Sequence, residues 1–231
     1  MKNLSLLFRA AVSLAAGLLA FSAARGQARN AVEEADLVIY GGTASGVMAA
    51  VQSARMKQRV ILIEPSNHLG GLTTSGLGAT DAGQRYTVGG IAREFYQRIW
   101  SYYEKPSAWR SETRESYMPK HPLIATEPFR AQWFFEPHVA SKILHEMLAE
   151  HPVAIHLNTR LDRAGGVRKQ NGTITEIATV DGRRFRAKIF IDATYEGDLL
   201  AAAGASYIVG REPNSRYGET MNGVRLEAPE R

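Results

Sequence analysis

Residues 36–64 constrain the fold more than any other part of the chain. They contain two short apolar runs, 37–39 and 60–63, of the kind that form strands buried on both faces of a parallel sheet. Between these runs, residues 46–57 carry apolar side chains at helical spacing, which gives one face that can lie on the sheet. The stretch therefore predicts a strand, a glycine-rich turn, a helix and a second parallel strand.

The turn, residues 41–46, reads Gly-Gly-Thr-Ala-Ser-Gly and matches the dinucleotide-binding pattern G-x-G-x-x-G at its first and last glycines. A pyrophosphate is favoured there because the helix N-terminus offers free N–H groups and the positive end of the helix dipole. Thr43 replaces the middle glycine, and this is compatible with a phosphate if its hydroxyl binds the phosphate or turns aside. Glu64 ends the second strand, where a carboxylate can accept hydrogen bonds from ribose hydroxyls. The alternative interpretation is an ordinary strand, turn and helix.

No Arg or Lys follows Glu64 within residues 65–69, so the 2′-phosphate of NADP would find no counter-charge. The glycine-rich loop at 65–78 is expected to pass close to a ligand, with Gly70 and Gly71 allowing the backbone to approach it. His68 in this loop is a candidate base or covalent flavin attachment point, but a surface histidine is the favoured interpretation.

Residues 1–28 have the pattern of a secretory signal peptide, in which basic residues precede a short apolar run, 10–20, and small residues follow it. The run is short for a membrane-spanning helix, so we expect cleavage, a secreted or periplasmic protein and no stable membrane anchor. The net charge of +5 belongs mostly to this leader, and no basic stripe predicts a nucleic-acid partner. The absence of cysteine excludes disulfides, a thiol nucleophile and cysteine-ligated iron–sulfur or zinc centres.

The rest of the chain predicts a helix at 89–103, an irregular insertion at 101–135 that covers a site, a helix at 139–150 and a strand at 153–158. Two turn signals, Asn-Gly at 171–172 and Asp-Gly at 181–182, then predict a three-stranded antiparallel meander within 159–191.

The last run of the meander region is expected to return to the parallel sheet and to lead into a small-residue helix. Three acids follow it, Asp192, Glu196 and Asp198, and they could suggest a metal site or an acid/base pair. Helix capping and the helix dipole explain them better, so we predict no metal.

These motifs in this order resemble the FAD-dependent oxidoreductases with a glutathione-reductase-type FAD-binding domain. The likeness is greatest to secreted bacterial members related to the flavoproteins of the heterodisulfide reductase type. It is carried by residues 38–46, 64–65, 68–71, 135–137, 191–199, 210–212 and 217–219. The implied fold class is α/β, a Rossmann-like parallel sheet with a three-stranded antiparallel meander, and residues 29–231 are the N-terminal part of that FAD-binding domain.

The resemblance implies FAD as the cofactor. The residues that it places on FAD are Gly41, Gly42, Thr43, Ala44, Ser45, Gly46, Glu64, Pro65, Gly70, Gly71, Leu72, Thr73, Arg160, Leu161, Ala193 and Thr194. Among them, 41–46 and 70–73 are expected along the pyrophosphate, Glu64 at the adenosine ribose, Arg160 and Leu161 at adenine, and Ala193 and Thr194 at the strand-end turn beside the cofactor.

The expected function is an exported FAD-dependent oxidoreductase that acts on a small-molecule substrate and an unidentified electron acceptor; no catalytic acid or base can be named. Such proteins normally continue beyond this length, so a truncated, non-catalytic remnant is the first alternative. An NAD-dependent dehydrogenase is the second, although a meander in place of further βαβ crossovers argues against it.

Overall fold

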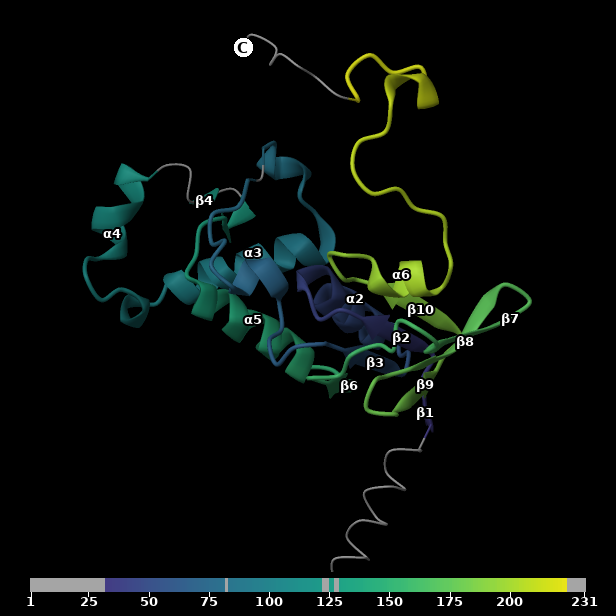
Figure 1. The fold of residues 1–231 in the computed structure, drawn as a ribbon. Coiled ribbons are helices and arrows are strands. Elements are labelled where there is room, and N and C mark those ends of the chain that lie inside the picture. The colour runs from purple at the N-terminus through teal and green to yellow at the C-terminus, as the bar shows by residue number, and fades with distance from the viewer. Residues whose placement is uncertain (1–31, 82, 122–124, 127–128, 224–231) are drawn as a thin grey trace, which may run out of the picture.

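The computed structural model describes residues 32–81, 83–121, 125–126 and 129–223 (Figure 1). The predicted leader, 1–28, lies outside these residues. Four strands form a parallel sheet in the order β10, β2, β3, β6. The strands are β2 (Leu37–Tyr40), β3 (Val60–Ile63), β6 (Val153–His156) and β10 (Ile189–Asp192). The two central strands, β2 and β3, are the two apolar runs of the predicted βαβ unit, and the predicted Rossmann-like fold class is confirmed.

The two central strands are buried on both faces, because alternate side chains point to opposite sides of a strand. Leu37 and Ile39 pack into a core shared with helices, whereas Val38 and Tyr40 pack into a second core on the other face. The sheet is therefore the middle layer of three.

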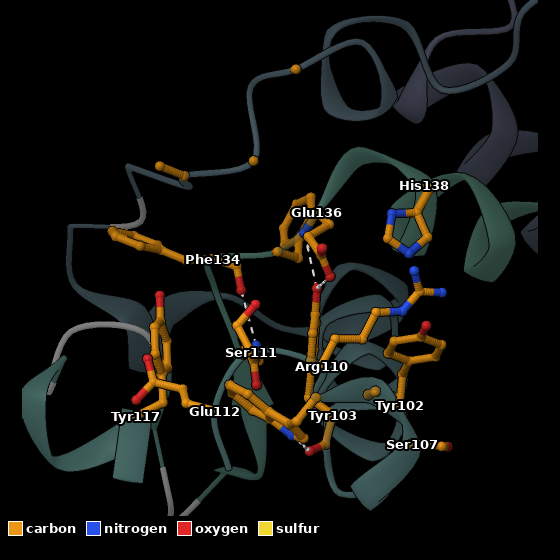
Figure 2. A pocket seen from close by; sticks show the side chains of 17 residues that line it. Tyr102, Tyr103, Ser107, Arg110, Ser111, Glu112, Tyr117, Phe134, Glu136 and His138 are labelled. Atoms are coloured by element: carbon orange, nitrogen blue, oxygen red, sulfur yellow. Dashed lines mark hydrogen bonds between the residues drawn. The ribbon is translucent and has the colours of Figure 1, made fainter. Parts of the chain in front are cut away.

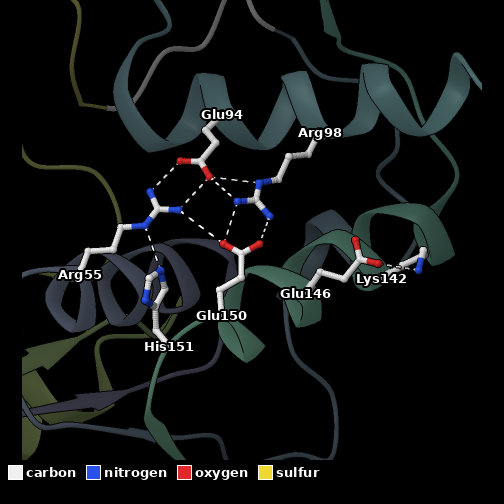
Figure 3. A network of polar contacts seen from close by, with 7 residues as sticks. All are labelled: Arg55, Glu94, Arg98, Lys142, Glu146, Glu150 and His151. Carbon is white, nitrogen blue, oxygen red and sulfur yellow. Dashed lines mark hydrogen bonds and ion pairs between the residues drawn. The ribbon is translucent and has the colours of Figure 1, made fainter.

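Helices cover one face of this sheet (Figure 1). They are α2 (Ala44–Arg55), α3 (Gly90–Tyr103) and α5 (Pro137–Ala149). Each carries an apolar stripe, and the stripes meet in one core. On their surface, Arg55, Glu94, Arg98 and Glu150 form an ion-pair network that joins the three helices (Figure 3).

A second sheet covers the other face, with strand order β1, β9, β8, β7. Its strands are β1 (Val32–Glu34), β7 (Val167–Gln170), β8 (Thr173–Ala178) and β9 (Arg184–Arg186). Strands β7, β8 and β9 pair antiparallel, as the predicted meander requires, while β1 joins β9 in parallel. The run expected as the third strand is divided: residues up to Arg186 stay in the meander, and the chain then crosses to the parallel sheet as β10. A strand cannot pair in two stacked sheets at once, so the crossing at 187–188 ends the pairing with the meander.

Short elements make up most of the expected insertion at 101–135. They are η3 (Pro106–Ala108), α4 (Arg114–Tyr117), η4 (Met118–Lys120), β4 (Ala125–Thr126) and β5 (Ala131–Gln132). The short turns η1 (Gly71–Thr74) and η2 (Arg85–Thr87) precede α3. After β10 come α6 (Asp198–Ala202) and η6 (Asn214–Arg216), in a stretch that extends away from the sheets (Figure 1). Within the described part of the chain, no helix has the length and apolar character needed to cross a bilayer.

Candidate cofactor site

The glycine turn joins the carboxyl end of β2 to the N-terminus of α2 and is packed too tightly for side chains at two positions. Gly41 has φ +107°, and a Cβ there would lie 2.6 Å from the carbonyl carbon of Ala193. A Cβ at Gly46 would collide with the carbonyl oxygen of Gly41. Glycine is therefore required at both ends of the turn, which brings β2, α2 and the end of β10 into direct backbone contact.

Thr43, at the middle position of the pattern, is the N-cap of α2. Its hydroxyl donates to the carbonyl of Ala193 at 2.7 Å and accepts a long hydrogen bond of 3.3 Å from the backbone N–H of Gly46. The side chain is thus turned aside into contacts within the protein, which is one of the two arrangements that the sequence left open. It ties the glycine turn to the strand-end turn after β10.

Glu64 follows β3 and spans two backbone segments. One carboxylate oxygen accepts the N–H of Gly42 at 2.6 Å, and the other accepts the N–H of Ser66 at 2.7 Å. Each carboxylate oxygen has two lone pairs, so both oxygens keep capacity for a further donor such as a ribose hydroxyl. The chain after β6 runs beside this residue, because Thr159 donates its N–H to the carbonyl of Glu64 at 3.0 Å.

The loop after Glu64 lies against the glycine turn, where Gly70 donates its N–H to the carbonyl of Gly42 at 2.7 Å. Gly70 and Gly71 both have positive φ, which glycine adopts most readily. The imidazole of His68 is exposed and lies 2.7 Å from the hydroxyl of Thr74 and 3.1 Å from that of Ser75. The histidine is thus held by hydroxyls of its own loop at the rim of the site.

The turn after β10 is held by Asp192. One carboxylate oxygen accepts the N–H and the hydroxyl of Thr194, at 2.9 and 2.6 Å, and the other accepts the N–H of Leu200 at 2.8 Å. Asp198 pairs with Arg163 at 3.1 Å. These acids therefore bind backbone and a cation, and no group of three potential metal ligands occurs among the residues described.

These turns surround a hollow of about 640 Å³ at the carboxyl ends of β2, β3 and β10, which we call the strand-end cavity. The predicted residues that line it are Gly41, Thr43, Glu64, Pro65, Gly71, Leu72 and Thr194. The other predicted residues of these turns, Gly42, Ala44, Ser45, Gly46, Gly70, Thr73 and Ala193, lie outside the lining. Several of them shape it from behind: Gly42 holds Glu64, and Gly46 and Ala193 pack behind the turn.

Sequence reasoning missed three lining residues, Ser66, Arg163 and Tyr195, and it considered Glu196 and Asp198 only as metal or acid/base candidates. Tyr195 is the most telling, because its hydroxyl accepts the N–H of Leu72 at 2.7 Å and closes the space beside Gly71. Its position directly after Ala193 and Thr194 was the available signal.

Arg160 and Leu161 do not line the strand-end cavity. Leu161 is buried between the two sheets, and its N–H donates to the hydroxyl of Tyr40 at 3.1 Å. Burial raises the pKa of that Tyr40 hydroxyl. From this segment the cavity receives Arg163 instead, so the expected contact of Arg160 and Leu161 with adenine stays a prediction.

A second and larger hollow of about 950 Å³ lies under the insertion, and we call it the aromatic cavity (Figure 2). Its walls come from the end of α3, the segment after η3, the start of α5 and residues 76–79. Tyr103, which is buried, donates its hydroxyl to a carboxylate oxygen of Glu136 at 2.9 Å and accepts the N–H of the same residue at 3.0 Å. Burial raises the pKa of the Tyr103 hydroxyl, which keeps it protonated as this donor.

A parallel sheet with a glycine turn, a helix N-terminus and a strand-end acid at one cavity defines a Rossmann-type dinucleotide-binding domain. The family model described as FAD dependent oxidoreductase matches residues 36–228. The chain belongs to this family, and FAD is its cofactor.

The same fold is found among solved structures. The L-proline dehydrogenase of P. horikoshii superposes with a TM-score of 0.50 at 17% identity, over 79% of this chain and 59% of that one. A geranylgeranyl bacteriochlorophyll reductase-like protein of Thermoplasma acidophilum superposes with a TM-score of 0.49 at 18% identity, over 78% of this chain and 44% of that one. The chain thus spans about half the length of these proteins. No curated protein matches its sequence significantly.

The residues present fit FAD. The side-chain-free turn at Gly41, the N-terminus of the 12-residue helix α2 and the acceptor Glu64 are arranged for a pyrophosphate followed by a ribose. Arg163, the basic side chain in the lining, is already paired with Asp198. Nothing in the lining therefore calls for an additional phosphate on that ribose.

Proposed function

We propose that this chain is the FAD-binding part of an exported oxidoreductase that acts on a small organic substrate and passes the electrons to a separate acceptor. The observation that carries the proposal is the convergence of Gly41, Glu64 and Thr194 on one cavity at the carboxyl edge of the parallel sheet. Export is supported by the leader-like pattern of residues 1–28.

The protein's own groups bind and orient the cofactor. Glu64 holds the ribose end, the N–H groups at the start of α2 face the pyrophosphate, and the loop at 70–73 continues along it. FAD, when bound, supplies the redox chemistry. Thr43 links the glycine turn to the strand-end turn after β10, and Asp192 holds that strand-end turn in place through Thr194.

The test is the visible absorption spectrum of the purified chain after incubation with FAD and desalting. A retained flavin spectrum with one FAD per chain is the expected result. A Glu64→Gln variant should release most of the flavin under the same conditions, while Glu34→Gln, an exposed acid on β1, should retain it.

A chain that is folded by circular dichroism but retains no flavin would overturn the proposal and favour a non-catalytic remnant. Retention of NAD in place of FAD would favour a nicotinamide-dependent dehydrogenase.

A further inference from the structure

The aromatic cavity begins where the strand-end cavity ends. Gly71, Leu72 and Ser75 line the strand-end cavity, and Gly76 and Gly78 line the aromatic cavity. One continuous glycine-rich segment therefore forms a wall of both. FAD is expected to run along residues 70–73 of this segment. A molecule in the aromatic cavity would therefore lie next to the end of FAD that is nearest to residues 76–78.

The charged groups of the aromatic cavity differ in whether they already have a partner. Of its two acids, Glu112 is paired with Lys120 at 2.9 Å, whereas Glu136 accepts the neutral hydroxyl of Tyr103 at 2.9 Å and keeps its charge. Arg110 and His138 have no hydrogen bond or ion pair with any residue that the structure describes. Figure 2 shows their side chains next to one another, with the guanidinium beside the imidazole. Glu136 holds its charge at the Tyr103 hydroxyl, and the guanidinium of Arg110 makes no ion pair with it or with any other described residue, so it can pair with a carboxylate that enters the cavity.

The walls around this cation are aromatic. Tyr102, Trp109, Tyr117 and Phe134 all line the cavity (Figure 2). The indole N–H of Trp109 is already donated to the carbonyl of Tyr103 at 2.8 Å, so what that side chain offers a ligand is its ring. Aromatic surfaces of this kind bind apolar bodies, whereas a small inorganic anion would gain nothing from them.

We propose that the aromatic cavity binds an organic carboxylate with an aromatic or other apolar body, and that its carboxylate pairs with Arg110. A guanidinium binds a carboxylate through two parallel hydrogen bonds, which fixes the orientation of the bound molecule. This assignment names the substrate class of the oxidoreductase and rests in that respect on the proposed function.

The test uses phenylacetate and its neutral analogue phenylacetamide as probes, titrated calorimetrically into the whole chain with and without prior incubation with FAD. Phenylacetate should bind at one site, and phenylacetamide about tenfold more weakly, because the amide cannot pair with the guanidinium. Arg110→Gln should weaken phenylacetate about tenfold and leave phenylacetamide unchanged.

The matched control is Lys105→Gln, which removes the same charge from an exposed position near η3 that does not line the cavity. It should change neither affinity. Equal binding of the two probes, phenylacetate binding that survives Arg110→Gln, or displacement of phenylacetate by equimolar inorganic phosphate would each overturn the carboxylate site, as would no binding at all.

Flavin retention is measured separately by visible absorption. If the chain binds phenylacetate but retains no FAD, the carboxylate site is supported, but its assignment as the substrate site of an oxidoreductase is not. If the chain retains FAD but binds phenylacetate and phenylacetamide equally, only the carboxylate site is overturned.

Discussion

The two cavities are built by opposite means. The strand-end cavity is shaped by backbone: tight turns follow β2, β3 and β10, and glycines stand where a Cβ would collide with the main chain. The aromatic cavity has one glycine-rich wall, at 76–78, but most of it is shaped by side chains that come from α3, α5 and the irregular segment between them. The strand-end cavity therefore follows from the topology of the sheet, whereas the aromatic cavity depends on which side chains lie over the helices.

This difference has a consequence for how each cavity responds to substitution. A backbone-defined site fails at once when one glycine is replaced, because main chain cannot move aside without disturbing several strands. A site defined by side chains loses one contact at a time. Substitutions can test this contrast, and the largest effect is expected in the glycine turn.

Replacing Gly46 with Ala should be the most damaging single change. The new Cβ would collide with the carbonyl oxygen of Gly41, and the turn and the start of α2 must separate to admit it. We expect a loss of about 2–3 kcal/mol in the free energy of unfolding, measured with urea, together with loss of flavin retention.

The matched control is Gly89→Ala at the N-cap of α3, where φ is also negative and a Cβ would meet nothing within 4 Å. It should cost less than about 1 kcal/mol. If the two variants were equally stable, tight backbone packing would not be what defines the strand-end cavity.

Glu64→Gln should act on binding more than on folding. The amide keeps one oxygen for the N–H of Gly42 or Ser66 but turns its NH₂ group toward the other and removes the charge. We expect the dissociation constant for FAD to rise roughly ten- to a hundredfold, as for hydrogen bonds to a charged group, when measured by quenching of flavin fluorescence. An unchanged dissociation constant would mean that Glu64 serves only to hold the glycine turn.

The strand-end turns could be predicted from the sequence because the rules that place them are local, while their contacts with FAD stay a prediction. Gly41, Glu64 and Thr194 each follow an apolar strand, and parallel strands bring their carboxyl ends to one edge. Tyr195 could not be placed by this reasoning, because its contact with Leu72 depends on a side-chain direction across 123 residues of sequence.

Prediction from the sequence fails where tertiary packing decides the position of a side chain or strand. Leu161 is itself one of the two expected adenine contacts, yet its side chain is buried in the core between the two sheets. The division of the predicted third meander strand into β9 and β10 depends on the distance between stacked sheets, which no local pattern encodes. The aromatic cavity was foreseen only as an insertion covering a site, because its walls come from segments paired by long-range contacts.

Glu94→Gln tests whether the ion-pair network helps to hold α2, α3 and α5 together. Glu94 on α3 binds Arg55 on α2 at 2.6 Å and Arg98 at 2.7 Å (Figure 3). The hydrogen bond from Arg55 and the charges of both arginines lower the pKa of Glu94 from 4.5 to about 2. We expect the variant to lose about 1–2 kcal/mol at pH 7, a value reduced by partial exposure to solvent.

A carboxyl whose pKa is lowered by folding stabilises the protein above its unfolded pKa, and this contribution is lost as the pH falls. The parent protein should therefore lose stability between pH 4.5 and about 2 more steeply than the variant, as followed by thermal unfolding. Glu146→Gln is the control, because its pair with Lys142 lies within α5 and is exposed; it should cost less than about 0.5 kcal/mol. If the two variants lost equal stability, the ion-pair network would contribute no more than an isolated surface pair.

Tyr103→Phe should have the smallest effect and bears on the aromatic cavity alone. The change removes a hydroxyl that donates to the carboxylate of Glu136 and accepts its N–H, while the ring and its packing remain. We expect a loss of about 1 kcal/mol in urea unfolding and unchanged flavin retention. Tyr102→Phe is the control, since that neighbouring hydroxyl has no hydrogen bond to any described residue; its effect should stay within about 0.5 kcal/mol. A loss of flavin in Tyr103→Phe would show that the two cavities are not built independently, because a contact wholly inside one would then control the other.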